Sequence, residues 1–470
     1  MRNTHQQELW QYSGFELARL LRERSVSAVE IAQVLLDRID ALNPALHAYI
    51  TIDRDVTMAQ ARAAQADFDR ARDRGPLQGI PVSLKDAIDT TSMRTTWGSK
   101  AFESRRPQTD AFVTRKLADA GAVLLGKANL LEFCAGPTHA APWGKTSNPW
   151  KLSHFAGGSS SGGGGAVAAG LGPISLGTDT GGSVRNPAAF CGVAGLKPTF
   201  GRLGRSGVFE LSFTLDHLGV LTRRVEDIAA TMAVVAGHDP DDIGSLRTPT
   251  PDYLDLKQNG RPRPVLLLPR AHFWEAVEPE VGKLVEDAIG VFRSLGYDMR
   301  EVTIDHAETV HRTHLAITPV ELSWRHGPMV AEITEGIGRN FRKRVAAGAK
   351  VFATDYAEAM NAREALQASL ARTMKGGALL LLPGSPCVSV PLTDSMATGE
   401  RPFDPVLGKG LAMFNDTGVP ALSVPCGFTS AGLPAAIQLV GLWDEEPQVF
   451  RTAIEYENAT GWWKRWPAIS

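Results

Sequence analysis

The chain has 470 residues, of which 43% are hydrophobic and 21% are charged. This composition is typical of a globular protein, and it excludes a disordered or fibrous chain. The Lys and Arg residues number 49 and the Asp and Glu residues 51, so the formal net charge is only -2. That balance argues against a nucleic-acid-binding protein, because such proteins carry a basic excess or a basic stripe.

The cysteines and the N-terminal segment indicate the cellular setting. The four cysteines are far apart and include no C-x-x-C pair: Cys134, Cys191, Cys387 and Cys426. We therefore expect neither a disulfide framework nor a cysteine-based zinc site, and we expect a reducing cytoplasm. The first eight residues lack the apolar core of a signal peptide, and no apolar run is long enough to span a bilayer.

The first elements predicted along the chain are helices. Ser27 and Glu30 have the spacing of a capping box, and apolar residues follow at helical spacing over 31–42. The pair Asn43-Pro44 is predicted to stop this helix. Residues 55–74 are rich in Ala, Arg, Asp and Gln, which is typical of an exposed helix.

Short apolar segments with strand character then alternate with helical segments. We predict strands over 80–84, 122–125, 173–177, 378–382 and 421–425, and a helix over 110–120. This alternation is typical of an α/β sheet with parallel character. The region 240–370 is more helical and is predicted to form a cap over the sheet. Its ends are not sharp enough to define a domain boundary, so we predict one domain over residues 1–470.

The most unusual segment of the sequence is the run 157–165, which consists of six glycines and three serines. Glycine at this density permits positive φ angles and close approach of the backbone. A flexible linker is the simplest alternative. A linker would not normally lie between apolar α/β segments and open a helix, so we favour a structured loop.

The same run contains the pattern G-x-S-x-G of a nucleophile elbow, with Ser160 at the serine position. This mechanism would need a later acid and a histidine, and it is the main rival enzyme mechanism. The candidate histidines are His217, His238, His272 and His306. None of them has a distinguishing sequence context, and so short a pattern is easily met by chance in a Gly/Ser run.

A second unusual segment surrounds Ser183, which follows two glycines after a predicted strand. The amides leading to this serine can form a concave nest of donors, namely Thr180, Gly181, Gly182 and Ser183 itself. Preorganised donors beside a nucleophile stabilise a tetrahedral oxyanion. Asp179 and Arg185 flank the segment and can brace the turn by pairing. The simpler alternative is a glycine-rich turn with a surface ion pair.

Lys85 is the third candidate, because it ends the apolar segment that begins at Gly79. A lysine that emerges from buried strand residues loses hydration, and this loss lowers its pKa. Only the neutral amine can act as a base. The alternative is a surface lysine that extends to solvent and pairs with Asp86.

Taken together, these segments resemble the amidase signature family, whose members are serine hydrolases that use a Ser–cisSer–Lys triad. The resemblance covers most of the chain and is strongest across 157–198, where the motif is long and specific. It also includes segments near 13–42, 79–86, 148–149, 418–428 and 432–441. It implies the amidase signature fold, a large mixed β-sheet covered by helices on both faces.

The resemblance also assigns roles to individual residues. Lys85 matches the catalytic lysine and Ser183 the nucleophile. Ser159, which lies 24 positions before Ser183, matches the bridging serine that follows a cis peptide bond. Thr180, Gly181 and Gly182 match the oxyanion loop, and Ser160, Asp179 and Arg185 match supporting positions. The chain departs from the family where Gly163, Gly164 and Gly165 follow the loop, and we expect these glycines to loosen it without affecting the triad.

The implied activity is hydrolysis of a C–N bond in a small amide through an acyl-enzyme on Ser183. Carbamate, ureide and ester substrates remain open, as does a homodimer. We expect no cofactor, no nucleic-acid partner and no membrane partner. A metal site is not favoured, because the spacing of His311 and His314, with Asp305 and Glu308 nearby, is also that of a polar helix face.

A further alternative is the A-type subunit of a glutamine amidotransferase, which acts with a partner. Such subunits carry an acidic residue that binds the amino group of glutamine. It lies upstream of the motif that begins at Asn415 in this chain. The stretch 407–414 has no acid, and the tyrosine-rich helix of these subunits is poorly matched near Tyr356. We therefore expect a free-standing amidase rather than a transamidation subunit.

Overall fold

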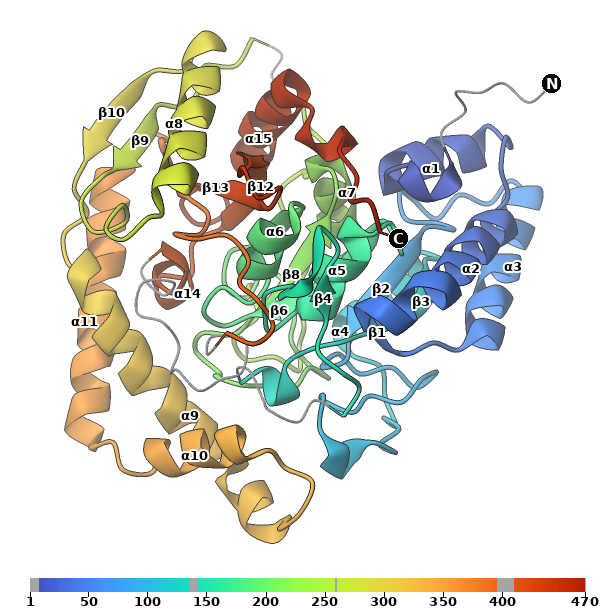
Figure 1. Ribbon diagram of the computed structural model, residues 1–470, viewed down its shortest axis with the longest axis horizontal. Helices are drawn as coiled ribbons and strands as arrows, with labels where there is room; N and C mark the ends of the chain where they lie inside the picture. The colour runs from blue at the N-terminus through green and yellow to red at the C-terminus, as the bar shows by residue number, and fades with distance from the viewer. Residues whose placement is uncertain (1–7, 136–141, 258–259, 395–409, 470) are drawn as a thin grey trace.

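An eleven-stranded β-sheet forms the centre of the molecule (Figure 1). The structure is a computed structural model that describes residues 8–135, 142–257, 260–394 and 410–469. Across the sheet, the strands follow the order β1 (Tyr49–Thr51), β3 (Val123–Ala128), β2 (Pro81–Lys85), β6 (Ile174–Asp179), β8 (His217–Thr222), β7 (Ala194–Lys197), β12 (Ala421–Phe428), β13 (Pro434–Val440), β11 (Leu379–Pro383), β9 (Leu266–Pro269) and β10 (Met299–Val302). A separate pair is formed by β4 (Ser147–Asn148) and β5 (Lys151–Phe155).

The sheet is mixed. Strand β2 runs parallel to β3 and β6, and β9 runs parallel to β10 and β11. The pairs that link these two groups through β8, β7, β12 and β13 are antiparallel. Each predicted strand overlaps an observed one, and the mixed sheet confirms the fold that the resemblance implies.

The helices, in chain order, are α1 (Gly14–Arg22), α2 (Ala28–Leu46), α3 (Arg54–Asp69), α4 (Phe112–Asp119), α5 (Ser161–Ala168), α6 (Arg185–Cys191), α7 (Val225–Val235), α8 (Pro279–Ser294), α9 (Val310–Glu332), α10 (Arg339–Gly348), α11 (Ala353–Thr373), α14 (Met413–Asp416) and α15 (Glu446–Thr460). No helix among the described residues combines the length and the apolar character needed to cross a bilayer.

Strand β8 shows how helices cover both faces of the sheet. Val220 belongs to the core cluster that includes Ile228 of α7. The next residue, Leu221, belongs to a different cluster with Val167 of α5 and Ala188 of α6. Because successive strand residues point to opposite faces, the sheet lies between a layer with α7 and a layer with α5 and α6.

The first long helix confirms one sequence prediction and corrects another. Ser27 and Glu30 form the predicted capping box at the start of α2. The predicted stop at Asn43-Pro44 is wrong, because α2 contains Pro44 and ends at Leu46. Leu46 is buried on the same helix face as Ile39, seven residues earlier, and this burial favours one further turn. The proline removes a single amide donor close to the end of the helix.

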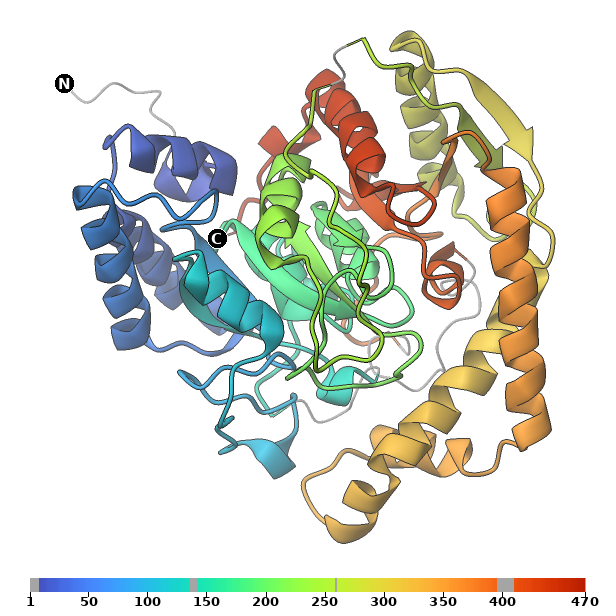
Figure 2. The ribbon, with the colours of Figure 1, turned by 180° about the vertical axis from the view of Figure 1, so that it is seen from behind.

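The region 240–370 contains more than helices. It supplies β9 and β10, which form one edge of the main sheet, and then α9, α10 and α11. Figures 1 and 2 show α11 beside this edge and α10 at the outer end of the group, away from the sheet. We call α9–α11 the helical arm. The single-domain organisation and the cap role stay predictions.

Candidate functional site

Lys85 lies at the carboxyl end of β2, between β3 and β6, and is only 1% exposed. Its Nζ is 2.8 Å from Ser159 Oγ and 2.6 Å from Thr178 Oγ1. Burial holds the pKa of Lys85 below its usual value. The alternative of a surface lysine paired with Asp86 is wrong, because Asp86 instead forms an ion pair with Lys127.

Ser159 follows a cis peptide bond, as the resemblance implies, since the Gly158–Ser159 bond is cis. Its carbonyl accepts a hydrogen bond from the Leu131 amide at 3.1 Å. Its hydroxyl meets Lys85, so the loop that precedes α5 and the end of β2 converge at one point.

The glycine run after Ser159 is a buried helix rather than a linker. Residues 161–168 form α5, and all of them are buried. A Cβ on Gly163 would lie 2.7 Å from Ser175 Oγ, and one on Gly164 would lie 2.9 Å from Pro187 Cβ. The expectation that Gly163, Gly164 and Gly165 loosen the loop is therefore wrong, because they let α5 pack closely against its neighbours.

The Ser183 segment lies beside the Ser159 segment. The Ser160 amide donates to the Ser183 carbonyl at 3.1 Å, which joins the two segments through their main chains. Ser183 itself is partly exposed, whereas Ser159 and Ser160 are buried. Of these three serines, only Ser183 is therefore accessible to solvent.

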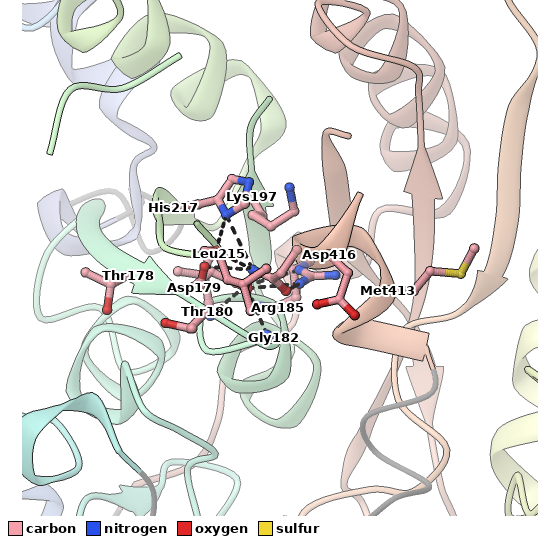
Figure 3. Close-up of polar contacts among 12 residues, drawn as sticks. Thr178, Asp179, Thr180, Gly182, Arg185, Lys197, Leu215, His217, Met413 and Asp416 are labelled. Carbon is pink, nitrogen blue, oxygen red and sulfur yellow. Dashed lines mark hydrogen bonds and ion pairs between the residues drawn. The ribbon is translucent and has the colours of Figure 1, made fainter. Parts of the chain in front are cut away.

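A buried ion pair braces the turn that carries Ser183. The Asp179 and Arg185 side chains are fully buried and pair at 2.9 Å (Figure 3). Asp179 Oδ1 also accepts from the Gly182 amide at 2.8 Å, and Oδ2 accepts from the Val184 amide at 3.0 Å. Burial opposes ionisation of Asp179, but Arg185 outweighs it and holds the pKa of Asp179 well below its usual range. The surface-pair alternative for these two residues is wrong.

Two residues from distant parts of the chain complete this brace, and the sequence motifs did not assign them to it. Asn415 Oδ1 accepts from Arg185 at 2.7 Å, and its Nδ2 donates to the Asp179 carbonyl at 2.7 Å. Gln438 Oε1 accepts from Arg185 at 2.9 Å. These contacts come from α14, β13 and the Ser183 turn, so the turn is fixed to the sheet.

The amides of the proposed oxyanion loop differ in their hydrogen bonding. Gly182 N–H is already engaged by Asp179. Within the described residues, the amides of Thr180, Gly181 and Ser183 have no acceptor. The Gly182 amide therefore holds the turn, and the donors that can meet a bound oxygen are Thr180, Gly181 and Ser183.

The nucleophile-elbow alternative for Ser160 does not fit the geometry. Ser160 Oγ donates to the Thr178 carbonyl at 3.1 Å and accepts from the Thr178 amide at 3.3 Å. The hydroxyl is thus occupied by the main chain of β6. Of the candidate histidines, His217 has its Nδ1 2.7 Å from the Leu215 carbonyl, and that contact also ties it to the main chain.

Histidines 311 and 314 do not assemble a metal site in the described part of the chain, where no group of three or more His, Cys, Asp or Glu side chains converges. His314 Nδ1 instead lies 3.0 Å from Asp416 Oδ1.

Two further residues near Lys85 were also missed from the sequence. Thr178 contacts Lys85 directly, and Cys134 Sγ lies 3.6 Å from Thr178 Oγ1.

Comparison with known proteins identifies the family of this fold and site. The family model Amidase matches residues 30–450. The A-type subunit of the glutamyl-tRNA(Gln) amidotransferase from Carboxydothermus hydrogenoformans is 36% identical over 491 residues, covering 98% of this chain and all of that protein. Its counterpart from Moorella thermoacetica is 34% identical, covering 98% of this chain and 99% of that protein.

Solved structures show the same similarity. A protein from a vestigial complex linked to the origins of an s-triazine catabolic enzyme has a TM-score of 0.88 at 28% identity, covering 96% of this chain and 99% of that one. A 6-aminohexanoate cyclic dimer hydrolase complexed with substrate has a TM-score of 0.87 at 26% identity, covering 98% and 100%. The A-type subunit of the glutamyl-tRNA(Gln) amidotransferase from Thermotoga maritima has a TM-score of 0.82 at 28% identity and full coverage of both chains.

These relatives bear on the choice between two functions that the sequence left open. They favour the amidotransferase subunit over the free-standing amidase that the residues before Asn415 suggested. Residues 407–409 of that stretch lie outside the described residues, and the remainder, 410–414, has no acid. The family model matches most of a chain that also has the buried lysine, the cis-linked serine and the braced Ser183 turn. This chain is therefore an enzyme of the amidase family.

Proposed function

We propose that this enzyme cleaves a C–N amide bond through a covalent acyl-enzyme on Ser183, with Ser159 and Lys85 as the proton relay. The observation that carries the proposal is the position of Lys85. It is buried, and its Nζ lies within hydrogen-bond distance of two hydroxyls, at 2.8 Å from Ser159 Oγ and 2.6 Å from Thr178 Oγ1. A buried amine in this setting favours the neutral form, and the neutral form accepts protons.

The proton path follows from this arrangement. Ser159 accepts the proton of Ser183 and passes its own proton to Lys85, while Ser183 Oγ attacks the substrate carbonyl carbon. The tetrahedral intermediate collapses as the C–N bond breaks. Ser159 returns a proton to the leaving nitrogen, and Lys85 resupplies Ser159. Water then attacks the acyl-enzyme by the same relay, which releases a carboxylic acid and restores the Ser183 hydroxyl.

The negative charge on the former carbonyl oxygen needs donors that are in place before reaction. The unengaged amides of Thr180, Gly181 and Ser183 are suited to this role, and Asp179 fixes the turn through Gly182. Removal of one such donor costs about 10²- to 10³-fold in kcat in other hydrolases.

The relatives favour a substrate and a partner for this chemistry. Because the chain is 36% identical to the A-type amidotransferase subunit of Carboxydothermus hydrogenoformans over nearly its full length, we propose that it is the amide-cleaving subunit of such an enzyme. In this role Ser183 would take the acyl part of glutamine and release ammonia, which a partner subunit would use. The proposed setting is the cytoplasm.

A free-standing amidase is the second candidate. The observation in its favour is the lack of an acidic residue in 410–414, where a glutamine-specific subunit would need one close by. A small amide, carbamate or ureide would then be the substrate, and a homodimer would be compatible with it.

One experiment separates the two candidates. Purified protein would be assayed for ammonia release from glutamine, alone and with the other subunits of the amidotransferase from the same source organism. A panel of simple amides, anilides, carbamates and ureides would be assayed in parallel. Glutamine turnover that requires the partners supports the subunit role. Turnover of panel substrates by the protein alone supports the amidase, and loss of all activity in Ser183→Ala is required by both.

A further inference from the structure

Gly181, a residue of the proposed oxyanion loop, lies against a side chain of the helical arm. Its amide has no acceptor among the described residues, and glycine has the greatest backbone freedom of any residue. A Cβ on Gly181 would lie 2.9 Å from His314 Nε2 and 3.2 Å from His314 Cε1. The edge of the His314 ring therefore fills the space on one side of this peptide.

The His314 ring is itself held at both nitrogens. Nδ1 lies 3.0 Å from Asp416 Oδ1, and a carboxylate only accepts, so Nδ1 carries the proton in this contact. Nε2 lies 3.3 Å from the hydroxyl of Thr318, one helical turn further along α9. His314 is 8% exposed and Asp416 is fully buried, so the ring has little freedom to turn.

Asp416 is well placed to orient this ring, because its own position is tied to the Ser183 turn. The preceding residue, Asn415, binds Asp179 and Arg185. The carbonyl of Asp416 accepts from Arg363 of α11. Helix α14 thus holds one side of the turn directly and the other side through His314.

We propose that His314, oriented by Asp416, is a positioning residue that keeps the Gly181 amide aimed at the substrate oxygen. This inference rests on the proposed acyl-enzyme mechanism at Ser183. A donor that is free to swing would have to be reordered in each turnover, whereas a donor held in place acts without that cost. The helical arm therefore contributes to the oxyanion loop without supplying a group that touches the substrate.

Two substitutions separate this role from a contribution to stability. His314→Asn keeps a donor for Asp416 but removes the ring edge beside Gly181. His314→Phe keeps a ring beside Gly181 but leaves Asp416 without that donor. The measurement is the second-order rate of Ser183 labelling by a fluorophosphonate, together with the melting temperature of each variant. This reagent places an oxygen in the oxyanion position, so it needs no knowledge of the substrate.

We expect His314→Asn to label at least about 10-fold more slowly than the unaltered protein, since small misplacements of reacting groups cost up to about 10²-fold. Its melting temperature should stay close to that of the unaltered protein. His314→Phe should show the opposite pattern, with faster labelling than the Asn variant and a lower melting temperature. His326→Asn is the matched control. His326 is also a buried histidine of α9, but it bonds the Glu210 carbonyl and stacks on Phe209.

The control should label Ser183 at the unaltered rate. An unaltered labelling rate in His314→Asn, or equal slowing in His314→Asn and His326→Asn, would overturn the inference. Failure of the proposed function gives a different result, because the unaltered protein would then not be labelled at Ser183 at all.

Discussion

Two buried lysines lie on neighbouring strands of the sheet and have different surroundings. Lys85 ends β2, and Lys127 lies on β3, paired in register with Leu84. Both are essentially inaccessible to solvent. Lys127 Nζ lies 3.2 Å from Asp86 Oδ1 and also contacts Thr95 and the Ile88 carbonyl. Lys85 contacts the hydroxyls of Ser159 and Thr178.

The difference indicates which of the two buried lysines is suited to act as a base. Burial lowers the pKa of both, and for Lys127 the carboxylate of Asp86 acts against this effect. Lys127 therefore suits the role of a cation that neutralises a buried carboxylate. Among the described residues Lys85 forms no ion pair with a carboxylate, so burial favours its neutral form. Burial alone does not make a lysine a base. The groups in contact with its amine decide whether the charged or the neutral form is favoured.

The largest expected effect is on catalysis. Lys85→Met should lower kcat by about 10³- to 10⁴-fold, because it removes the base from the relay. Lys127→Met should leave kcat of the folded protein within a few-fold of the unaltered value. Steady-state kinetics on the best substrate from the panel, with folding checked by circular dichroism, measures both. Similar losses in the two variants would break the distinction between the lysines.

The next effect is on stability, and here the larger effect is expected from substitution of Lys127 rather than Lys85. Lys127→Met should lower the free energy of unfolding by about 3–5 kcal/mol, because it leaves the buried Asp86 carboxylate unpaired. The double variant Lys127→Met with Asp86→Asn should recover part of this loss. Urea unfolding measures each value. A Lys127→Met protein as stable as the unaltered one would show that Asp86 does not need its cation.

A third substitution would make the surroundings of Lys85 resemble those of Lys127. Thr178→Asp places a carboxylate next to Lys85 Nζ, and an opposite charge at this distance raises a lysine pKa by about 1–3 units. The acid limb of the pH–rate profile should move to higher pH by a similar amount. Thr178→Val, which adds no charge, is the control. If the acid limb does not move in Thr178→Asp, the acid limb does not report the protonation of Lys85.

The unaltered enzyme should lose activity as the pH falls. In the proposed mechanism the base is the neutral amine, so activity is present above the folded-state pKa of Lys85 and declines as protonation increases below it. Burial lowers this pKa, which extends activity below the ordinary lysine range. The measurement is kcat/KM against pH, and a profile that stays flat down to about pH 4 would count against Lys85 as the base.

The smallest effect concerns the glycine helix that follows Ser159. Gly163→Ala should destabilise the protein by about 1–3 kcal/mol, because its Cβ would lie 2.7 Å from Ser175 Oγ on β6. Gly290→Ala is a matched control, since Gly290 is also in a helix and, apart from the adjacent backbone of that helix, nothing lies within 4 Å of its Cβ position. Thermal unfolding would compare the two, and equal stability would mean that α5 can move away from the sheet.

Local patterns predicted the parts of the site that lie within single motifs. The apolar segment 80–84 indicated a buried strand that ends at Lys85, and the glycines around Ser183 indicated a tight turn. Five strands of the main sheet were also visible as short apolar runs, namely β2, β3, β6, β11 and β12. The end of α2 was not, because burial of Leu46 outweighs the proline signal at Pro44.

The rest of the site depends on contacts that sequence spacing does not encode. Asn415 and Gln438 lie more than 200 residues from Arg185, and only the folded sheet brings them to it. The spacing of His314 favoured a polar helix face over a metal site, and nothing in it indicated a contact with Gly181. Strands β9 and β10 are short, and their region reads as helical. In the sequence, a glycine such as Gly181 can indicate that there is no room for a side chain at that position. It does not indicate which neighbouring side chain fills the space.

The most direct test of the Ser183–Ser159–Lys85 mechanism is to label the protein with a fluorophosphonate and map the adduct by peptide mass spectrometry, beside the Lys85→Met and Lys127→Met variants. We expect an adduct on Ser183 that forms far more slowly in Lys85→Met and at nearly the unaltered rate in Lys127→Met. An adduct on Ser160, or labelling of Ser183 that does not depend on Lys85, would contradict this mechanism.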